Sequence, residues 1–364
     1  MAGTLLTVQD LKVGFRTEHG FVRAVDGVSF DLEAGQTIGI VGESGSGKTV
    51  TAKALMNLLP SYAQIEGTVS FDDRDVLAMA ANREKHFWGV DMTMVFQDPM
   101  TSLNPVKKIG EQIAESLRVH LNKSRREALA EAGDLLEQVG IPEPGKRLTQ
   151  YPHELSGGLR QRVVIAMALA CGPRLLIADE PTTALDVTIQ KQILDLVRKL
   201  RDERDMGILF ITHDLGVIAE IADRVAVMFR GKLVEEGSVR DIFRAPKHPY
   251  TKGLLACRPK LDTTWRRLPT VSDFMDVDVV DGKVEITEKA SSLAELEDQF
   301  GEGRGRYLHP PTKLAELGHP LERTPLVDDA TTAPEGEAPL LKVEDLKVWF
   351  GILALVVVEL GLIT

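Results

Sequence analysis

The 364-residue chain contains only two cysteines, Cys171 and Cys257. They lie far apart without the spacing of metal ligands, which excludes a disulfide framework and a zinc site and is typical of a reducing compartment. The chain also lacks a basic excess, since 43 Lys and Arg stand against 54 Asp and Glu for a formal net charge of −11. Wholesale binding of nucleic acid needs a basic face, so this charge argues against nucleic-acid partners.

Long apolar segments are also scarce. The longest apolar run, Ile352 to Val358, is too short to cross a bilayer. The first residues, Met1 to Thr4, show no basic region followed by an apolar core, so we expect no signal peptide. Together these absences predict that any membrane association is peripheral.

The remaining composition is that of a globular protein. Hydrophobic residues make up 43% of the chain and charged residues 27%, both ordinary for a folded domain. A length of 364 residues allows one large domain or two smaller ones.

A glycine-rich loop that opens a helix is the most informative stretch. It has the form G-x-x-x-x-G-K-[ST] and consists of Gly42, Glu43, Ser44, Gly45, Ser46, Gly47, Lys48 and Thr49. An apolar strand-like run at 37–41 precedes it and a helix-compatible segment at 50–59 follows, which is the context of a P-loop. Backbone N–H groups and the helix N-terminus would hold nucleotide phosphates. Lys48 would reach the β- and γ-phosphates and Thr49 would ligate Mg²⁺; the alternative is a chance glycine-rich turn.

Two carboxylates end a second apolar run, residues 174–181 (RLLIADEP). Charges on a buried strand are costly unless they serve a metal or a partner. Beside a P-loop, Asp179 fits a Mg²⁺ ligand and Glu180 fits a base that polarises the attacking water. The alternative is a solvated strand end.

Polar side chains also end two other strand-like runs. Residues 92–96 lead to Gln97, which could position water or metal beside a phosphate, although strand ends are often polar. Residues 207–212 lead to His213. The carboxyl ends of parallel strands carry the ligand site in α/β sheets, so a γ-phosphate contact by His213 and a structural histidine both stay open.

Two further strands are expected upstream of the P-loop, at residues 5–15 and 24–32. An aromatic side chain there could stack on a nucleotide base. Phe15 is the first candidate and Phe21 the second, with a core role as the alternative for either.

The middle of the chain has helical periodicity. Between 109 and 139, Ile109, Ile113 and Leu117 fall on one helix face, which predicts a helical insertion in an α/β domain. Further on, Leu155-Ser156-Gly157-Gly158 precedes an apolar helix at 163–170. A serine and two glycines at a helix start form an anion site or a simple N-cap.

In this order, the P-loop, Gln97, LSGG, ADE and His213 resemble the ATP-binding subunit of ABC transporters, whose signature is LSGG. Longer strings are similar to the dipeptide/oligopeptide/nickel importer branch: FQDPMTSLNP at 96–105, DEPTTALDVTIQ at 179–190, FITHDLGVIAEIADRVAVM at 210–228 and HPYTKGLL at 248–255. The resemblance implies an α/β P-loop NTPase (ABC ATPase) over residues 1–260. That fold has an antiparallel β subdomain and a helical subdomain at roughly 100–165, and here a poorly structured C-terminal extension follows.

The resemblance also implies a mechanism in which two such domains close head to tail around two ATP molecules. Each domain's own site would combine the P-loop, catalytic residues Glu180, His213 and Gln97, and an adenine platform at Phe15. Mg²⁺ would be held by Thr49, Gln97 and Asp179. The partner's ATP would be contacted by the signature residues Ser156, Gly157, Gly158 and Gln161, and Asp186 would lie at the dimer seam.

The implied partners are a second ABC ATPase subunit, two integral membrane permease subunits and, indirectly, an extracytoplasmic solute-binding protein, without nucleic acid. Residues 99–105 and the helical insertion would contact a permease coupling helix. The chain would act at the cytoplasmic face of the cell membrane, where hydrolysis of ATP drives import of di- or oligopeptides or related solutes. Nickel and glutathione stay open, because specificity in this family resides in the permease and the binding protein.

Beyond residue 260 the resemblance fades. This branch commonly carries a cysteine-rich extension, and with only Cys257 nearby no iron–sulfur site is expected. Residues 261–338 are interpreted as extension and linker. Residues 340–350 (LLKVEDLKVWF) match residues 5–15 (LLTVQDLKVGF) at eight of eleven positions. Such self-similarity predicts that residues 339–364 begin a truncated second ABC-like domain, with a generic strand pattern as the alternative.

Two alternatives to a working importer subunit remain at this stage. One is a non-transport ABC ATPase that acts on ribosomes or DNA, although such proteins usually carry two complete cassettes or a long coiled coil. The other is an uncoupled, truncated half of a tandem ABC protein. ATPase activity stimulated by a permease would distinguish the importer subunit from both.

Overall fold

The computed structural model of the chain describes residues 3–17, 20–81, 87–183, 185–257, 270–280 and 283–289. The chain divides into two compact units, Met1–His309 and Pro310–Thr364, and every described residue belongs to the first. Residues 290–338 of the predicted extension and linker, and the predicted second domain at 339–364, lie outside the described residues.

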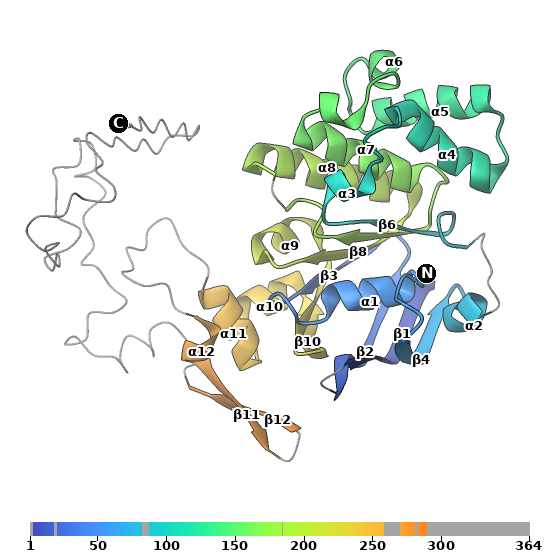
Figure 1. Ribbon diagram of the computed structural model, residues 1–364. Helices are drawn as coiled ribbons and strands as arrows, with labels where there is room; N and C mark the ends of the chain where they lie inside the picture. Colours follow the sequence, from blue (N-terminus) through green and yellow to red (C-terminus); the bar gives the residue numbers. More distant parts are fainter. Residues whose placement is uncertain are drawn as a thin grey trace, which may run out of the picture. The chain divides into compact units, whose positions relative to one another are not determined.

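A six-stranded sheet in the order β10-β9-β3-β8-β7-β6 lies at the centre of this unit (Figure 1). Its strands are β3 (Thr37–Val41), β6 (Met92–Val95), β7 (Leu175–Asp179), β8 (Gly207–Thr212), β9 (Arg224–Phe229) and β10 (Lys232–Ser238). All are parallel except β10, which runs antiparallel to β9. The segments that follow β6, β7, β8 and β3 therefore leave the sheet side by side along one edge.

A second, antiparallel sheet has the order β2-β1-β4-β5. It consists of β1 (Thr4–Thr17), β2 (Gly20–Glu33), β4 (Ala63–Phe71) and β5 (Arg74–Asp75). The strands predicted at 5–15 and 24–32 are present and longer than expected. Helix α2 (Val76–Ala81) follows β5.

Helix α1 (Lys48–Leu55) begins inside the P-loop. It was predicted to reach residue 59, before Pro60, but it ends at Leu55 because Asn57 adopts a left-handed backbone with φ 53°. Asparagine is one of the few residues that enter this region at low cost, so the chain leaves the helix a turn earlier than the proline requires.

The helical subdomain lies beyond β6 in Figure 1. Its elements are α3 (Pro99–Ser102), α4 (Ile109–Leu121), α5 (Arg125–Gln138), α6 (Pro144–Arg147), a 3₁₀ turn (Pro152–Glu154) and α7 (Gly157–Leu169). The helical segment expected at 109–139 is two helices. The left-handed Asn122 closes α4, and Ser124 with Glu127 forms a capping box that opens α5.

The central sheet separates two apolar clusters. Ile38, Leu209 and Ile211 face the antiparallel sheet and α1, whereas Ile208 and Phe210 face the helical side. This alternation follows the two-residue period of a strand. Because both faces of the sheet are covered, its strands are continuous apolar runs.

The remaining elements all lie after β7 in the sequence. They are α8 (Val187–Arg204), α9 (Leu215–Ile221), α10 (Val239–Arg244), α11 (Pro249–Ala256), α12 (Val271–Phe274), β11 (Met275–Val280) and β12 (Lys283–Glu288). The sequence predicted a poorly structured extension after residue 260. Part of that extension is a short helix and a β11–β12 hairpin, joined to α11 by the Lys252–Glu288 ion pair at 2.6 Å.

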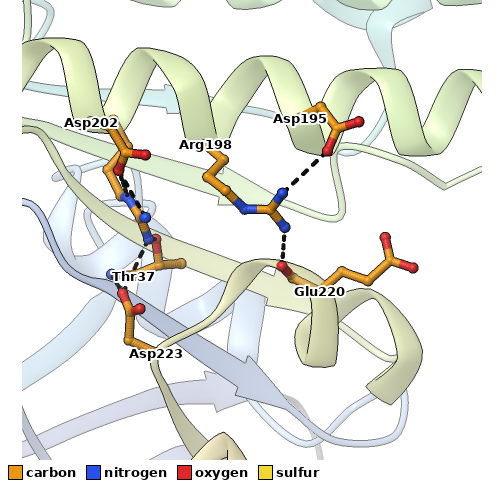
Figure 2. A network of polar contacts seen from close by, with 7 residues as sticks. Thr37, Asp195, Arg198, Asp202, Glu220 and Asp223 are labelled. Atoms are coloured by element: carbon orange, nitrogen blue, oxygen red, sulfur yellow. Dashed lines mark hydrogen bonds and ion pairs between the residues drawn. The ribbon is translucent and has the colours of Figure 1, made fainter.

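A polar network fixes helices α8 and α9 to the sheet (Figure 2). Arg201 donates to the hydroxyl of Thr37, the first residue of β3, at 3.0 Å and to the Asp223 carboxylate at 3.1 Å. Asp223 also accepts from the backbone N–H of Thr37 at 2.7 Å. Arg198 on α8 donates to the carbonyl of Glu220 on α9. The network sits at the amino ends of the strands, so it braces the sheet from the edge opposite to the P-loop.

Within the described ranges, none of the helices has both the length and the apolar character needed to cross a bilayer.

Candidate functional site

The P-loop wraps around the ammonium group of Lys48. Lys48 Nζ donates to the carbonyl oxygens of Gly42 at 2.8 Å and Glu43 at 2.9 Å. The side chain is buried, and burial lowers the pKa of Lys48, although Glu180, Asp179 and Glu43 act in the opposite direction. A buried cation in a loop of backbone amides is suited to phosphate oxygens.

Gly47 shows why this loop needs glycine. Its φ is +105°, and a Cβ there would lie 2.5 Å from the carbonyl oxygen of Ala24 on β2. Any side chain would therefore push the loop away from β2 and strain its backbone.

Asp179 ends β7 beside the first turn of α1. Its side chain is buried, and Oδ1 accepts a hydrogen bond from the Thr49 hydroxyl at 3.1 Å. Burial raises the pKa of Asp179, an effect that the Thr49 hydrogen bond only partly opposes. A nearby cation would stabilise the ionised form of a carboxylate that is buried in this way.

Three polar side chains meet on one oxygen of Glu180. Oε2 accepts from Gln97 Nε2 at 3.0 Å and from the Thr183 hydroxyl at 3.0 Å, and it lies 3.2 Å from His213 Nδ1. The ends of β6, β7 and β8 thus converge on a carboxylate that is only 13% exposed. The structure brings together the polar strand ends that the sequence singled out.

The backbone of Glu180 is also unusual. Its φ is +49°, a region that residues other than glycine seldom occupy. Its N–H donates to the carbonyl of Ile211 on β8 at 2.8 Å. Residues held in such sparsely populated conformations cluster at functional sites.

Two of the residues predicted to face a partner subunit act as helix caps within this chain. Ser156 caps α7 by accepting from the N–H of Leu159 at 3.4 Å, and Asp186 caps α8 by accepting from Ile189 at 2.9 Å. Gly157 and Gly158 form the first turn of α7. Gln161 is buried, and its Nε2 has no hydrogen-bond partner among the described residues. Their roles toward a partner's nucleotide stay predictions.

The strand register brings the predicted adenine platform near the P-loop. Phe15 pairs with Val22, two residues from Ala24, which contacts Gly47. Its half-buried ring meets the edge of Tyr62, with centroids 6.3 Å apart. The second candidate, Phe21, lies over Gly14. Stacking of either ring on adenine stays a prediction.

Sequence reasoning missed two contacts. Thr183 reaches Glu180 because the chain turns sharply after β7, and Tyr250 accepts a hydrogen bond from the P-loop N–H of Glu43 at 2.9 Å. Both residues lie in strings that carried the family resemblance, DEPTTALDVTIQ and HPYTKGLL, but no local pattern assigns them a contact.

Comparison with known families agrees with this geometry. Residues 25–183 match the family model described as ABC transporter. Residues 234–275 match the model described as oligopeptide/dipeptide transporter, C-terminal region.

The chain belongs to the ABC transporter ATP-binding family. Within that family, its C-terminal match assigns it to the oligopeptide/dipeptide group. The predicted α/β P-loop fold, with its antiparallel β subdomain and helical subdomain, is confirmed.

Curated ABC relatives share more than half of the matched residues. The glutathione import ATP-binding protein GsiA of Shigella dysenteriae serotype 1 (strain Sd197) is 54% identical over 286 residues, 74% of this chain and 45% of that protein. The protein of the same name from Escherichia coli (strain K12) gives the same figures. The chain thus spans less than half the length of the curated relatives it matches.

Solved ABC structures share the fold. The ATP-binding cassette MJ0796, in a dimeric post-hydrolysis state bound to ADP and Pi, is 25% identical with a TM-score of 0.58, covering 65% of this chain and 99% of that one. CbiO1 from Clostridium perfringens, part of the complex cbiONQ, is 25% identical with a TM-score of 0.56, covering 66% and 91%.

Proposed function

We propose that this chain hydrolyses ATP to ADP and phosphate and so energises an ABC importer for peptide-like solutes. The observation that carries the proposal is the convergence of Gln97, Thr183 and His213 on Glu180 Oε2. This cluster adjoins the buried Lys48 and Asp179. The site therefore combines a phosphate-binding loop, a carboxylate suited to a cation and a proposed general base.

The residues present fit Mg²⁺. Thr49 Oγ1 and Asp179 Oδ1 are hard oxygen donors only 3.1 Å apart, and Gln97 can add an amide oxygen. Among the described residues no three His, Cys, Asp or Glu side chains form a metal cluster. The ion would take oxygens of the nucleotide phosphates as its further ligands. When bound, Mg²⁺ neutralises charge on the phosphate oxygens.

In the proposed reaction, Glu180 accepts a proton from the water that attacks the γ-phosphorus. The new P–O bond forms as the bond to the β–γ bridging oxygen breaks, and the electron pair leaves with ADP. Gln97, Thr183 and His213 fix the carboxylate, so that its orientation toward the water is set before the reaction. The ammonium of Lys48 has three N–H donors. Two of them are held by the Gly42 and Glu43 carbonyls, and the third would donate to a phosphate oxygen.

The proposed partners are a second ABC ATPase subunit and two permease subunits, with an extracytoplasmic binding protein acting indirectly. The segment after Gln97 supports a docking surface, because Met100 is 59% exposed and Val106 is 80% exposed. Large apolar side chains that are exposed to this extent favour contact with another protein. The chain would sit peripherally at the cytoplasmic face of the membrane.

The proposed solutes are di- or oligopeptides, including glutathione-like peptides. The match of residues 234–275 to the oligopeptide/dipeptide region supports this class, as do the names of the GsiA relatives. Nickel chelates are a second class that the resemblance allows.

A variant that should bind ATP but hydrolyse it slowly tests the proposal. Tagged Glu180→Gln protein is mixed with detergent-solubilised native membranes and Mg-ATP, and the captured proteins are identified by mass spectrometry. Two integral permeases should be recovered with Glu180→Gln. The matched Lys48→Ala/Glu180→Gln variant, which lacks the phosphate contact, should recover far less. Capture of ribosomal or DNA-repair proteins in place of permeases would contradict the transport role.

A further inference from the structure

Tyr250 joins the C-terminal region to the P-loop. Its side chain is completely buried, and its ring packs against Phe229 with centroids 4.4 Å apart. Its hydroxyl accepts the hydrogen bond from the backbone N–H of Glu43 at 2.9 Å. A buried tyrosine hydroxyl usually has a partner, and here that partner is an amide of the phosphate-binding loop.

The same peptide group is held from its other side by Lys48. The N–H of Glu43 and the carbonyl of Gly42 belong to one planar unit, and in a trans peptide they point in opposite directions. The carbonyl accepts from Lys48 Nζ at 2.8 Å, while the N–H donates to Tyr250. The hydroxyl of Tyr250 and the ammonium of Lys48 therefore fix the tilt of one peptide plane between them.

We infer that Tyr250 is a positioning residue for nucleotide binding, which orients the Gly42–Glu43 peptide and through it the ammonium of Lys48. The inference rests on the proposed function, because it takes the P-loop to bind ATP. It means that the nucleotide site is completed by residues of the C-terminal region, outside the segment 25–183 that matches the ABC model.

Helix α11 is built to hold Tyr250 in place. His248 caps it by accepting from the N–H of Tyr250 at 3.1 Å, and the Glu235 carboxylate on β10 accepts from the N–H of His248 at 3.0 Å. On the opposite side, a Cβ at Gly253 would lie 3.3 Å from Cα of Val271 on α12. These contacts allow the helix little freedom to shift, so a rigid element presents the hydroxyl to the loop.

The neighbouring residue offers a matched control. Thr251 is as fully buried as Tyr250, but its hydroxyl has no hydrogen-bond partner among the described residues. Thr251→Val removes a hydroxyl that makes no hydrogen bond to any described residue. Tyr250→Phe removes the hydroxyl that accepts from the P-loop and leaves the packed ring in place.

The experiment measures the Kd for Mg-ATP, KM, kcat and the melting temperature of the full chain. Tyr250→Phe should raise Kd and KM about fivefold to tenfold, the loss typical of one hydrogen bond. Its kcat at saturating ATP should stay within about twofold, because Tyr250 does not touch the reacting atoms. Thr251→Val should leave Kd within about twofold of wild type, the scatter expected where no interaction is removed.

A double-mutant cycle tests the route through Lys48. In the Lys48→Met background, Tyr250→Phe should change Kd by less than about twofold, because the group that it positions is gone. Full additivity of the two substitutions would overturn the inference. It would equally be overturned if Tyr250→Phe lowered the melting temperature but kept the Kd of Thr251→Val. Failure of the wild-type chain to bind ATP would instead overturn the proposed function itself.

Discussion

Both the side chain and the backbone of Glu180 are tightly held in the site. Its carboxylate has three polar neighbours, and its left-handed backbone carries a conformational cost of order 1–3 kcal/mol. The hydrogen bond from its N–H to Ile211 and the crowded carboxylate hold it there. The chain thus maintains a strained conformation at the residue that we propose as the catalytic base.

We expect Glu180→Gln to bind ATP with near-normal affinity and to hydrolyse it at least about a hundredfold more slowly. The amide has nearly the same shape but cannot take the proton from water. Phosphate release at saturating Mg-ATP measures the effect. Glu43→Gln is the matched control, since that carboxylate is exposed in the P-loop and its backbone contacts remain. Turnover near the wild-type rate in Glu180→Gln would remove Glu180 from its role.

Both cysteines should be poorly reactive in the folded chain. Burial raises the pKa of Cys257 to about 12, and burial also raises the pKa of Cys171. A raised pKa leaves less thiolate at any given pH, and the thiolate is the nucleophile. At pH 8, alkylation of Cys257 by iodoacetamide should be on the order of a hundredfold slower in the native chain than in denaturant. Peptide mass spectrometry measures both rates, and equal rates would contradict the burial of Cys257.

The individual site residues were predictable to different degrees. Lys48 and Thr49 follow from the spacing of one short motif, and the meeting of Gln97, Glu180 and His213 follows from parallel strands that end at a common edge. Thr183 depends on the turn made possible by the positive φ of Glu180, which no composition pattern reveals. Tyr250 reaches a residue 207 positions away, so it could be found only in three dimensions.

Among the elements, helix α11 is closely packed against its neighbours and is capped by a titratable residue, His248. Burial lowers the pKa of His248 below its usual 6.5, although Glu235 and Glu288 oppose the shift while Lys252 adds to it. Because the folded-state pKa of this base is lowered, its contribution to stability is present above pH 6.5 and is lost as the pH falls through the lower value. Protonation also removes the lone pair with which Nδ1 caps α11.

We therefore expect the wild-type chain to lose more thermal stability than His248→Asn between pH 8 and pH 5. Asparagine can cap the helix but does not titrate. The difference in melting-temperature loss should be about 2 °C or more, as one helix cap is worth about 1 kcal/mol. Circular dichroism melts at both pH values provide the comparison. Parallel losses in the two proteins would show that His248 does not titrate in this range.

The helices show which local signals suffice for prediction. Helix α8 carries strong local signals, because Asp186 caps its start and its apolar positions repeat along the helix. The break between α4 and α5 was missed, since it depends on the left-handed conformation of Asn122, which asparagine tolerates but does not require. The β11–β12 hairpin was missed although both of its strands alternate apolar and polar residues, because it lies in the extension beyond the strings that carried the family resemblance. Elements with strong caps and long periodicity are predictable, and turns that rest on one residue are not.

For the whole molecule, bound nucleotide should act as a clamp between the two sheets. The P-loop lies between β3 of the central sheet and Ala24 of β2 in the antiparallel sheet, so a ligand that rigidifies it stabilises the contact between both. At a free Mg-ATP concentration of 100 Kd, linkage gives about 2.7 kcal/mol.

We expect Mg-ATP to raise the melting temperature of Glu180→Gln by about 5–10 °C, the shift that this free energy gives in a large domain. This variant is used because it does not consume the ligand. Differential scanning fluorimetry measures the shift against protein without nucleotide. The Lys48→Ala/Glu180→Gln variant should show a shift of no more than a third as much at the same concentration, because its affinity is lower. Equal shifts in both variants would contradict binding through Lys48.

The position of β3 between β8 and β9 has a consequence for the chain as it is synthesised. The first residue of β3, Thr37, pairs with Asp223, 186 positions later, and the P-loop meets Tyr250 207 positions after Glu43. Until the ribosome has made those residues, β3 is an apolar strand with two open edges, the kind of segment that associates with other chains. Such distant pairings also slow folding. We therefore expect the motif that is translated early to be among the last parts of the protein to acquire its structure.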